Sequence, residues 1–166
     1  MTQKTSKSLT IQHMTITSNR AFAIVRQALE EVLPTLDTTI IDSLRKGDQA
    51  RAQEYDDKGP RLSIFGERNH GALLEIVGLP RYAIQYEIGN PLTASKMTRH
   101  QLGAALYAPL RVLLREDDEG NGVFEYDLPS SFFGQFGDEQ VTAVGRMLDE
   151  YLDAALSKAA EQQPAA

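Results

Sequence analysis

The corner around Asn90 carries the residue types that most clearly suggest a binding site. Gly89-Asn90-Pro91-Leu92 follows an alternating strand pattern and predicts a helix start, because Asn suits the capping position and Pro the first turn. A helix N-terminus presents unpaired amides and about half a positive charge, which favours carboxylate or phosphate. Lys96, Arg99 and Arg111 follow along the chain and would add cationic donors. The alternative is an ordinary capped helix whose Asn and Pro only enforce the turn.

Two histidines offer a different chemistry. His70 comes directly after a predicted strand, and His100 follows Met97 by three residues, near one face of a helix. With Met97, Glu67 or Tyr86, these imidazoles would ligate a metal or haem, or act as an acid–base pair. The chain has no HxxH, HxxxH or HExxH spacing, so this is the weaker alternative, and we expect no metal and no cofactor.

Nucleophilic catalysis and calcium binding lack their usual patterns. Ser63, Ser130 and Ser131 lie in no Gly-x-Ser-x-Gly elbow, and no His is near them in sequence. The acidic run 116–119 lacks the ligand spacing of a calcium loop and indicates a solvated hairpin tip. Catalytic residues therefore stay unassigned.

Composition limits the remaining classes of function. The 166 residues suit one domain, and the absence of Cys excludes disulfides, thiolate metal sites and cysteine nucleophiles. The formal net charge of −6 argues against nucleic acid as a partner. The charge is uneven: residues 61–115 carry 7 basic and 3 acidic side chains, whereas residues 116–166 carry 2 and 12. A locally basic middle would attract a small anion; the alternative is that these charges alternate on solvated faces and have no binding role.

No targeting or membrane signal is visible in the sequence. The first eight residues are polar and have no apolar core, unlike a secretory signal. The longest uncharged apolar stretch, residues 102–110, is far shorter than the roughly 20 residues that span a bilayer. We therefore expect a cytoplasmic protein with no membrane partner.

In the first half of the chain, residues 9–17 predict a strand with a bulge near His13, whose imidazole we expect to be partly buried. Ser18 or Asn19 would cap a helix that ends near Pro34, with one apolar stripe. A second helix is predicted over residues 38–53, followed by a turn at 54–60 and a strand at 61–65 that stops at Gly66.

In the second half, residues 70–77 predict a short helix closed by Gly78, and residues 82–88 the clearest strand. A hairpin follows, with strands at 109–115 and 123–127. Asp138 would cap a long final helix, with a frayed tail from residue 157. Strands with segregated helices predict an α+β domain.

Four short motifs in a fixed order resemble the DUF302 family: Phe65-Gly66, Gly89-Asn90-Pro91-Leu92, Leu106 to Val112, and Tyr126 to Ser130. The resemblance implies a TATA-binding-protein-like α+β fold, a curved, mostly antiparallel sheet with helices packed on one face (β-α-β(4)-α with a helical insert). It also implies a homodimer, but no particular reaction. We expect one domain over residues 8–156, with flexible tails at 1–7 and 157–166.

We expect a non-catalytic domain that binds a small anionic or amphiphilic, partly apolar ligand. The Ile88–Thr93 corner and the Leu106–Val112 stretch would enclose one shared hollow. The alternatives are a structural or protein-interaction module, and an enzyme or metal protein using His70 and His100. The expected ligand-binding residues are Phe65, Arg68, His70, Tyr86, Asn90, Thr93, Arg99, His100, Tyr107 and Arg111.

Overall fold

A five-stranded antiparallel sheet organises the chain. The computed structural model describes residues 1–161. The strands stand in the order β1-β5-β4-β3-β2, with β1 and β2 at the two edges. Their bounds are β1 His13–Ala21, β2 Ser63–Asn69, β3 Ala83–Gly89, β4 Leu110–Glu116 and β5 Asn121–Asp127. The predicted α+β class and antiparallel sheet are confirmed.

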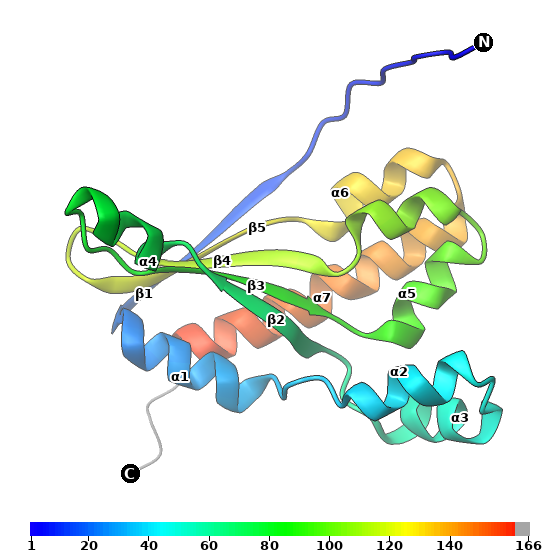
Figure 1. The fold of residues 1–166 in the computed structure, drawn as a ribbon, viewed down its shortest axis with the longest axis horizontal. Coiled ribbons are helices and arrows are strands. Elements are labelled where there is room, and N and C mark those ends of the chain that lie inside the picture. The colour runs from blue at the N-terminus through cyan, green and yellow to red at the C-terminus, as the bar shows by residue number, and fades with distance from the viewer. Residues whose placement is uncertain (162–166) are drawn as a thin grey trace.

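Helices α1 and α7 lie on one side of this sheet, whereas the short helix α4 projects at one end of it (Figure 1). The remaining helices gather beyond the opposite end (Figure 1). Among residues 1–161, no helix has both the length and the apolar composition needed to cross a membrane. The helices are α1 Phe22–Val32, α2 Thr38–Arg45, α3 Gln49–Lys58, α4 Gly71–Leu74, α5 Pro91–Thr98, α6 Pro129–Phe133 and α7 Glu139–Glu161, with 3-10 turns η1 Glu75–Val77, η2 Leu102–Tyr107 and η3 Gly134–Phe136.

The core lies between α1, α7 and the sheet face that they cover. Alternation along β3 and β4 follows the prediction, because Tyr86 pairs with Val112 and Ile84 with Leu114, and all four are buried. Phe124 of β5 pairs with Leu114 and is fully buried. The hydrophobic alternation of β3, β4 and β5 therefore fixes the register in which these strands pair.

The first strand begins and ends later than predicted. It runs to Ala21, and its register shifts between Thr17 and Ala21 rather than near His13. Helix α1 accordingly has no Ser or Asn cap: the Phe22 amide donates to the Gly120 carbonyl of the β4–β5 turn at 2.9 Å. The prediction failed because a carbonyl distant in sequence replaces the local side-chain cap.

Three further boundaries were wrong. The predicted helix 38–53 breaks at Gly47, whose φ of +73° ends α2, and Asp48 caps α3 by accepting from the Arg51 amide at 3.0 Å. Helix α3 then continues to Lys58, through most of the predicted turn. Strand β2 passes Gly66 to Asn69, because Phe65 forms an irregularity in the ladder and pairing with β3 resumes at Gly66.

The last helix continues into the expected tail. Helix α7 reaches Glu161, and Ala159 and Ala160 are buried. The buried Ser18 hydroxyl donates to the Ala160 carbonyl at 2.7 Å, which ties the helix end to β1. The Ala-rich composition predicted a tail because the sequence does not show that β1 packs against this end of the helix. The tail predicted for residues 162–166 lies outside the described residues.

Asn90 links three segments at the point where β3 turns into α5. Its Oδ1 accepts from the amides of Leu92 at 2.9 Å and Thr93 at 3.1 Å, as a helix cap should. Its Nδ2 donates to the Pro60 carbonyl at 2.9 Å, so the same side chain holds the approach to β2. The predicted helix start is confirmed, with Pro91 in the first turn.

We expect Asn90→Ala to destabilise the protein more than Asp48→Ala. Asp48 only caps an exposed helix, and its loss should cost about 1 kcal/mol. Loss of Asn90 removes a cap and also leaves the Pro60 carbonyl unpaired. We therefore expect the free energy of unfolding, measured in urea, to fall by about 2–3 kcal/mol. Asn90→Asp, which keeps the cap acceptor but loses the donor, should fall between them. Equal losses for the two alanine variants would contradict the linking role.

Candidate functional site

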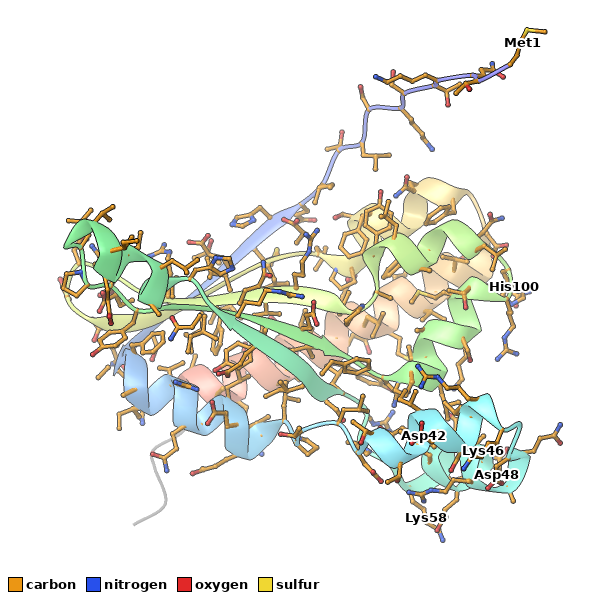
Figure 2. All side chains as sticks on the ribbon, viewed as in Figure 1. Met1, Asp42, Lys46, Asp48, Lys58 and His100 are labelled. Carbon is orange, nitrogen blue, oxygen red and sulfur yellow. The ribbon has the colours of Figure 1, made fainter. Side chains whose placement is uncertain are left out.

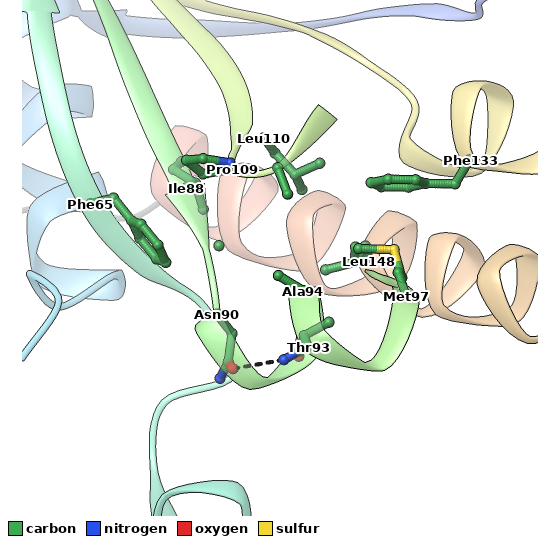
Figure 3. Close-up of a pocket in the computed structure, with 12 residues that line it drawn as sticks. Phe65, Ile88, Asn90, Thr93, Ala94, Met97, Pro109, Leu110, Phe133 and Leu148 are labelled. Atoms are coloured by element: carbon green, nitrogen blue, oxygen red, sulfur yellow. Dashed lines mark hydrogen bonds between the residues drawn. The ribbon is translucent and has the colours of Figure 1, made fainter. Parts of the chain in front are cut away.

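An apolar pocket of about 100 Å³ lies where β3 turns into α5 (Figure 3). It brings the Ile88–Thr93 corner and the Leu106–Val112 stretch around one hollow, and that expectation is confirmed. Helices α6 and α7 contribute to its walls through Phe133 and Leu148. The full lining is Phe65, Ile88, Gly89, Asn90, Thr93, Ala94, Met97, Ala108, Pro109, Leu110, Phe133 and Leu148.

Two local features leave space for this pocket: the missing side chain of Gly89 and the irregular position of Phe65 in β2. A Cβ on Gly89 would lie 3.5 Å from Pro109 Cβ and 3.7 Å from Phe65 Cε1, so a longer side chain there would enter the space between them. Phe65 occupies the ladder irregularity of β2, and its ring turns toward β3 (Figure 3). The pocket therefore depends on the local geometry of β2 as well as on α5.

The pocket is nearly without polar groups. Among its lining side chains only Asn90 and Thr93 are polar, and none is charged. The Asn90 side chain already pairs with the Leu92 and Thr93 amides, so the helix start does not present those amides to an anion. Since an isolated charge is costly in apolar surroundings, the pocket suits an uncharged apolar group.

The predicted cations lie away from this pocket. Arg68 Nη1 donates to Glu87 at 2.6 Å on β3, and Lys96 Nζ donates to Asp56 at 2.8 Å. Arg99 Nε donates to the Ser95 carbonyl at 3.2 Å. Arg111 lines a separate crevice of about 70 Å³ with Tyr107, Asp127 and three apolar residues. Of the ten expected ligand-binding residues, Phe65, Asn90 and Thr93 line the apolar pocket.

The two histidines lie at opposite ends of the sheet. His70 precedes α4, and His100 follows α5; Figure 1 shows these helices at opposite ends, and Figure 2 shows His100 pointing outward. The seven-residue strand β3, which is roughly 20 Å long, runs between the two positions. The hypothesis that both imidazoles share one cleft is therefore wrong.

The other members of that hypothetical site are engaged elsewhere. The buried Tyr86 hydroxyl donates to Glu30 at 3.3 Å, and burial raises the pKa of the phenol well above its usual value of 10.0. Glu67 accepts from Arg26 at 3.3 Å. In the described part of the chain, no group of three or more His, Cys, Asp or Glu side chains is arranged to hold a metal ion.

His13 differs from its prediction as well, because its side chain is 56% exposed. Its Nδ1 lies 3.1 Å from Asp127 Oδ1, and its Nε2 lies 3.6 Å from Glu125 Oε2. These contacts are on the sheet face that α1 and α7 leave uncovered, away from the apolar pocket.

Several lining residues were missed as site residues, although the sequence holds a signal for some of them. Asn90, Thr93, Ala94 and Met97 follow the i, i+3, i+4, i+7 spacing of one helix face, and that face lines the pocket. Phe133 and Leu148 have no such signal, because their sequence positions are far from α5.

Comparison with known proteins agrees with this fold. The family described as "Domain of unknown function DUF302" matches residues 57–159. A crystal structure of an uncharacterized conserved DUF302 protein from Bacillus stearothermophilus is similar, with a TM-score of 0.65 and 16% sequence identity, over 89% of this chain and 97% of that one. Among curated proteins, none matches the chain. The chain belongs to the DUF302 family, whose function is unknown.

Proposed function

We propose that this DUF302 protein is a small-molecule-binding domain that holds a compact apolar group of its ligand in the apolar pocket. The observation that carries the proposal is the pocket itself: about 100 Å³ of apolar space that no charged side chain of residues 1–161 lines. An apolar cavity of roughly 150 Å³ stays dry and takes up benzene. A somewhat smaller space suits a branched alkyl group of about four carbons.

The lining supports binding rather than catalysis. The Asn90 amide is used within the protein, and Thr93 supplies one hydroxyl. No acid, base or cation of residues 1–161 lines the apolar pocket. An enzyme would require at least one group that changes charge or attacks within reach of the ligand.

Ala94→Leu should abolish binding without unfolding the protein. The added side chain would fill the space that the ligand needs, since Ala94 lines the pocket and is only partly buried. The measurement is a thermal shift with alcohols and carboxylic acids that carry alkyl groups of about three to six carbons. A ligand at about 100 times its Kd should stabilise the wild type by about 2.7 kcal/mol.

Ala143→Leu, on an exposed position of α7, provides the matched control and should bind like the wild type. Equal binding by Ala94→Leu, or no shift of the wild type with any compound, would contradict the proposal.

A protein-interaction role is a second candidate, and one surface favours it. The segment from Leu73 to Leu79, here called the apolar loop, spans α4, η1 and the residues after them. Its Leu73, Ile76, Val77 and Leu79 side chains are 67%, 91%, 63% and 60% exposed. Monomeric soluble proteins rarely leave so many neighbouring aliphatic side chains uncovered. A second copy of the chain is the occupant that the family resemblance suggests.

If the apolar loop forms a homodimer, Leu73→Glu with Ile76→Glu should produce monomers in light scattering. Charges placed in an apolar interface oppose association. Leu102→Glu with Leu106→Glu is the matched control, because these residues are 83% and 80% exposed on η2, away from the loop. A monomeric wild type, or the same effect from both pairs, would rule out this dimer.

A further inference from the structure

A second cavity, here called the polar chamber, adjoins the apolar pocket. It measures about 240 Å³ and lies between the end of α3, the start of α5 and the middle of α7. Asn90 and Thr93 line both cavities, so one wall separates an apolar space from a polar one. A ligand that crosses this wall would place two chemically different ends in the two cavities.

The polar chamber is lined by two acidic and two basic side chains, of which one pair forms a salt bridge. Its charged lining consists of Asp56, Asp57, Arg61 and Lys96. Lys96 Nζ donates to both carboxylate oxygens of Asp56, at 2.8 and 3.1 Å, so this pair satisfies itself. One cation, Arg61, and one anion, Asp57, then remain for a ligand.

Arg61 is held in place without a carboxylate partner. Its guanidinium lies over the Tyr151 ring, 4.8 Å from the centroid, and Nη1 donates to the Tyr151 hydroxyl. Within residues 1–161 it forms no ion pair. Stacking orders the side chain in advance, so less conformational entropy is lost when the guanidinium binds a carboxylate.

Asp57 also lacks an opposite charge. Its Oδ1 accepts from Gln53 Nε2 at 2.9 Å, and no ion pair to it occurs in the described part of the chain. A second carboxylate lines the same chamber, which disfavours a ligand carrying only negative charge. A head group with one carboxylate and one ammonium matches the two unpaired charges.

One residue of the chamber lining, Tyr55, has a buried hydroxyl that is unpaired as well in the described part of the chain. Tyr55 lines the chamber, is 5% exposed, and its hydroxyl has no hydrogen-bond partner within residues 1–161. Buried hydroxyls usually have partners, so a polar ligand atom within reach of this hydroxyl would be favoured.

We propose that the ligand is a free α-amino acid with a compact apolar side chain, an inference that rests on the proposed function of the apolar pocket. The side chain occupies the apolar pocket, Arg61 binds the carboxylate and Asp57 the ammonium. The volume of about 100 Å³ suits a branched aliphatic side chain.

Calorimetry with four matched probes tests the proposal. L-leucine has both charges, 4-methylpentanoate lacks the ammonium, 3-methylbutylamine lacks the carboxylate, and 3-methylbutanol has neither. We expect L-leucine to bind at least about tenfold more tightly than each of the others, because each missing charge forfeits a charge-assisted hydrogen bond.

The variants should give a crossed pattern that a structural role would not produce. Arg61→Gln should weaken the binding of L-leucine and of 4-methylpentanoate but not that of 3-methylbutylamine. Asp57→Asn should weaken the binding of L-leucine and of 3-methylbutylamine but not that of 4-methylpentanoate. Arg45→Gln and Asp42→Asn, a paired Arg and Asp on α2, should leave all four affinities unchanged.

The outcomes separate the two proposals. If 4-methylpentanoate or 3-methylbutanol binds as tightly as L-leucine, and Ala94→Leu abolishes that binding, the zwitterion inference is overturned and the apolar pocket stands. If none of the four probes binds, the inference is overturned. The thermal-shift panel of alcohols and carboxylic acids then tests whether the apolar pocket binds any ligand.

Discussion

One side chain, Asn90, holds together the part of the structure on which any binding role depends. Its carbonyl oxygen satisfies two free amides at the start of α5, and its amide nitrogen satisfies the Pro60 carbonyl before β2. The end of β3, the start of α5 and the segment that follows α3 therefore keep fixed positions. A polar side chain at this depth is stable because its donor and its acceptor are both used.

The two cavities follow from that arrangement. On one side of Asn90 and Thr93, the residues of β2, β3, β4, α5, α6 and α7 are apolar and leave a small uncharged space. On the other side, the end of α3 and Arg61 bring charged groups to a larger space. The helix start does not form the expected anion site, because the Asn90 side chain already accepts from the Leu92 and Thr93 amides. The cation best placed for a ligand is Arg61, which stacks on Tyr151 of α7.

Local signals account for what the sequence predicted well. The Asn90-Pro91 helix start, the β4–β5 hairpin and the Asp138 cap all depend on neighbouring residues, and all occur in the structure. Long-range contacts account for the errors: the Gly120 carbonyl begins α1, pairing with β3 carries β2 past Gly66, and Ser18 of β1 holds the end of α7. The site shows the same contrast. Asn90, Thr93 and Phe65 were predicted from local motifs, whereas Phe133, Leu148 and Arg61 reach the two cavities only through the tertiary fold.

The most direct measurement is the electron density of the apolar pocket in crystals of protein purified from cells without added ligand. We expect continuous density, not accounted for by protein or water, that begins between Phe65, Met97 and Pro109 and passes Thr93 toward Arg61. A pocket closed by rearranged side chains, or one containing only separate waters, would contradict a ligand-binding role for this domain.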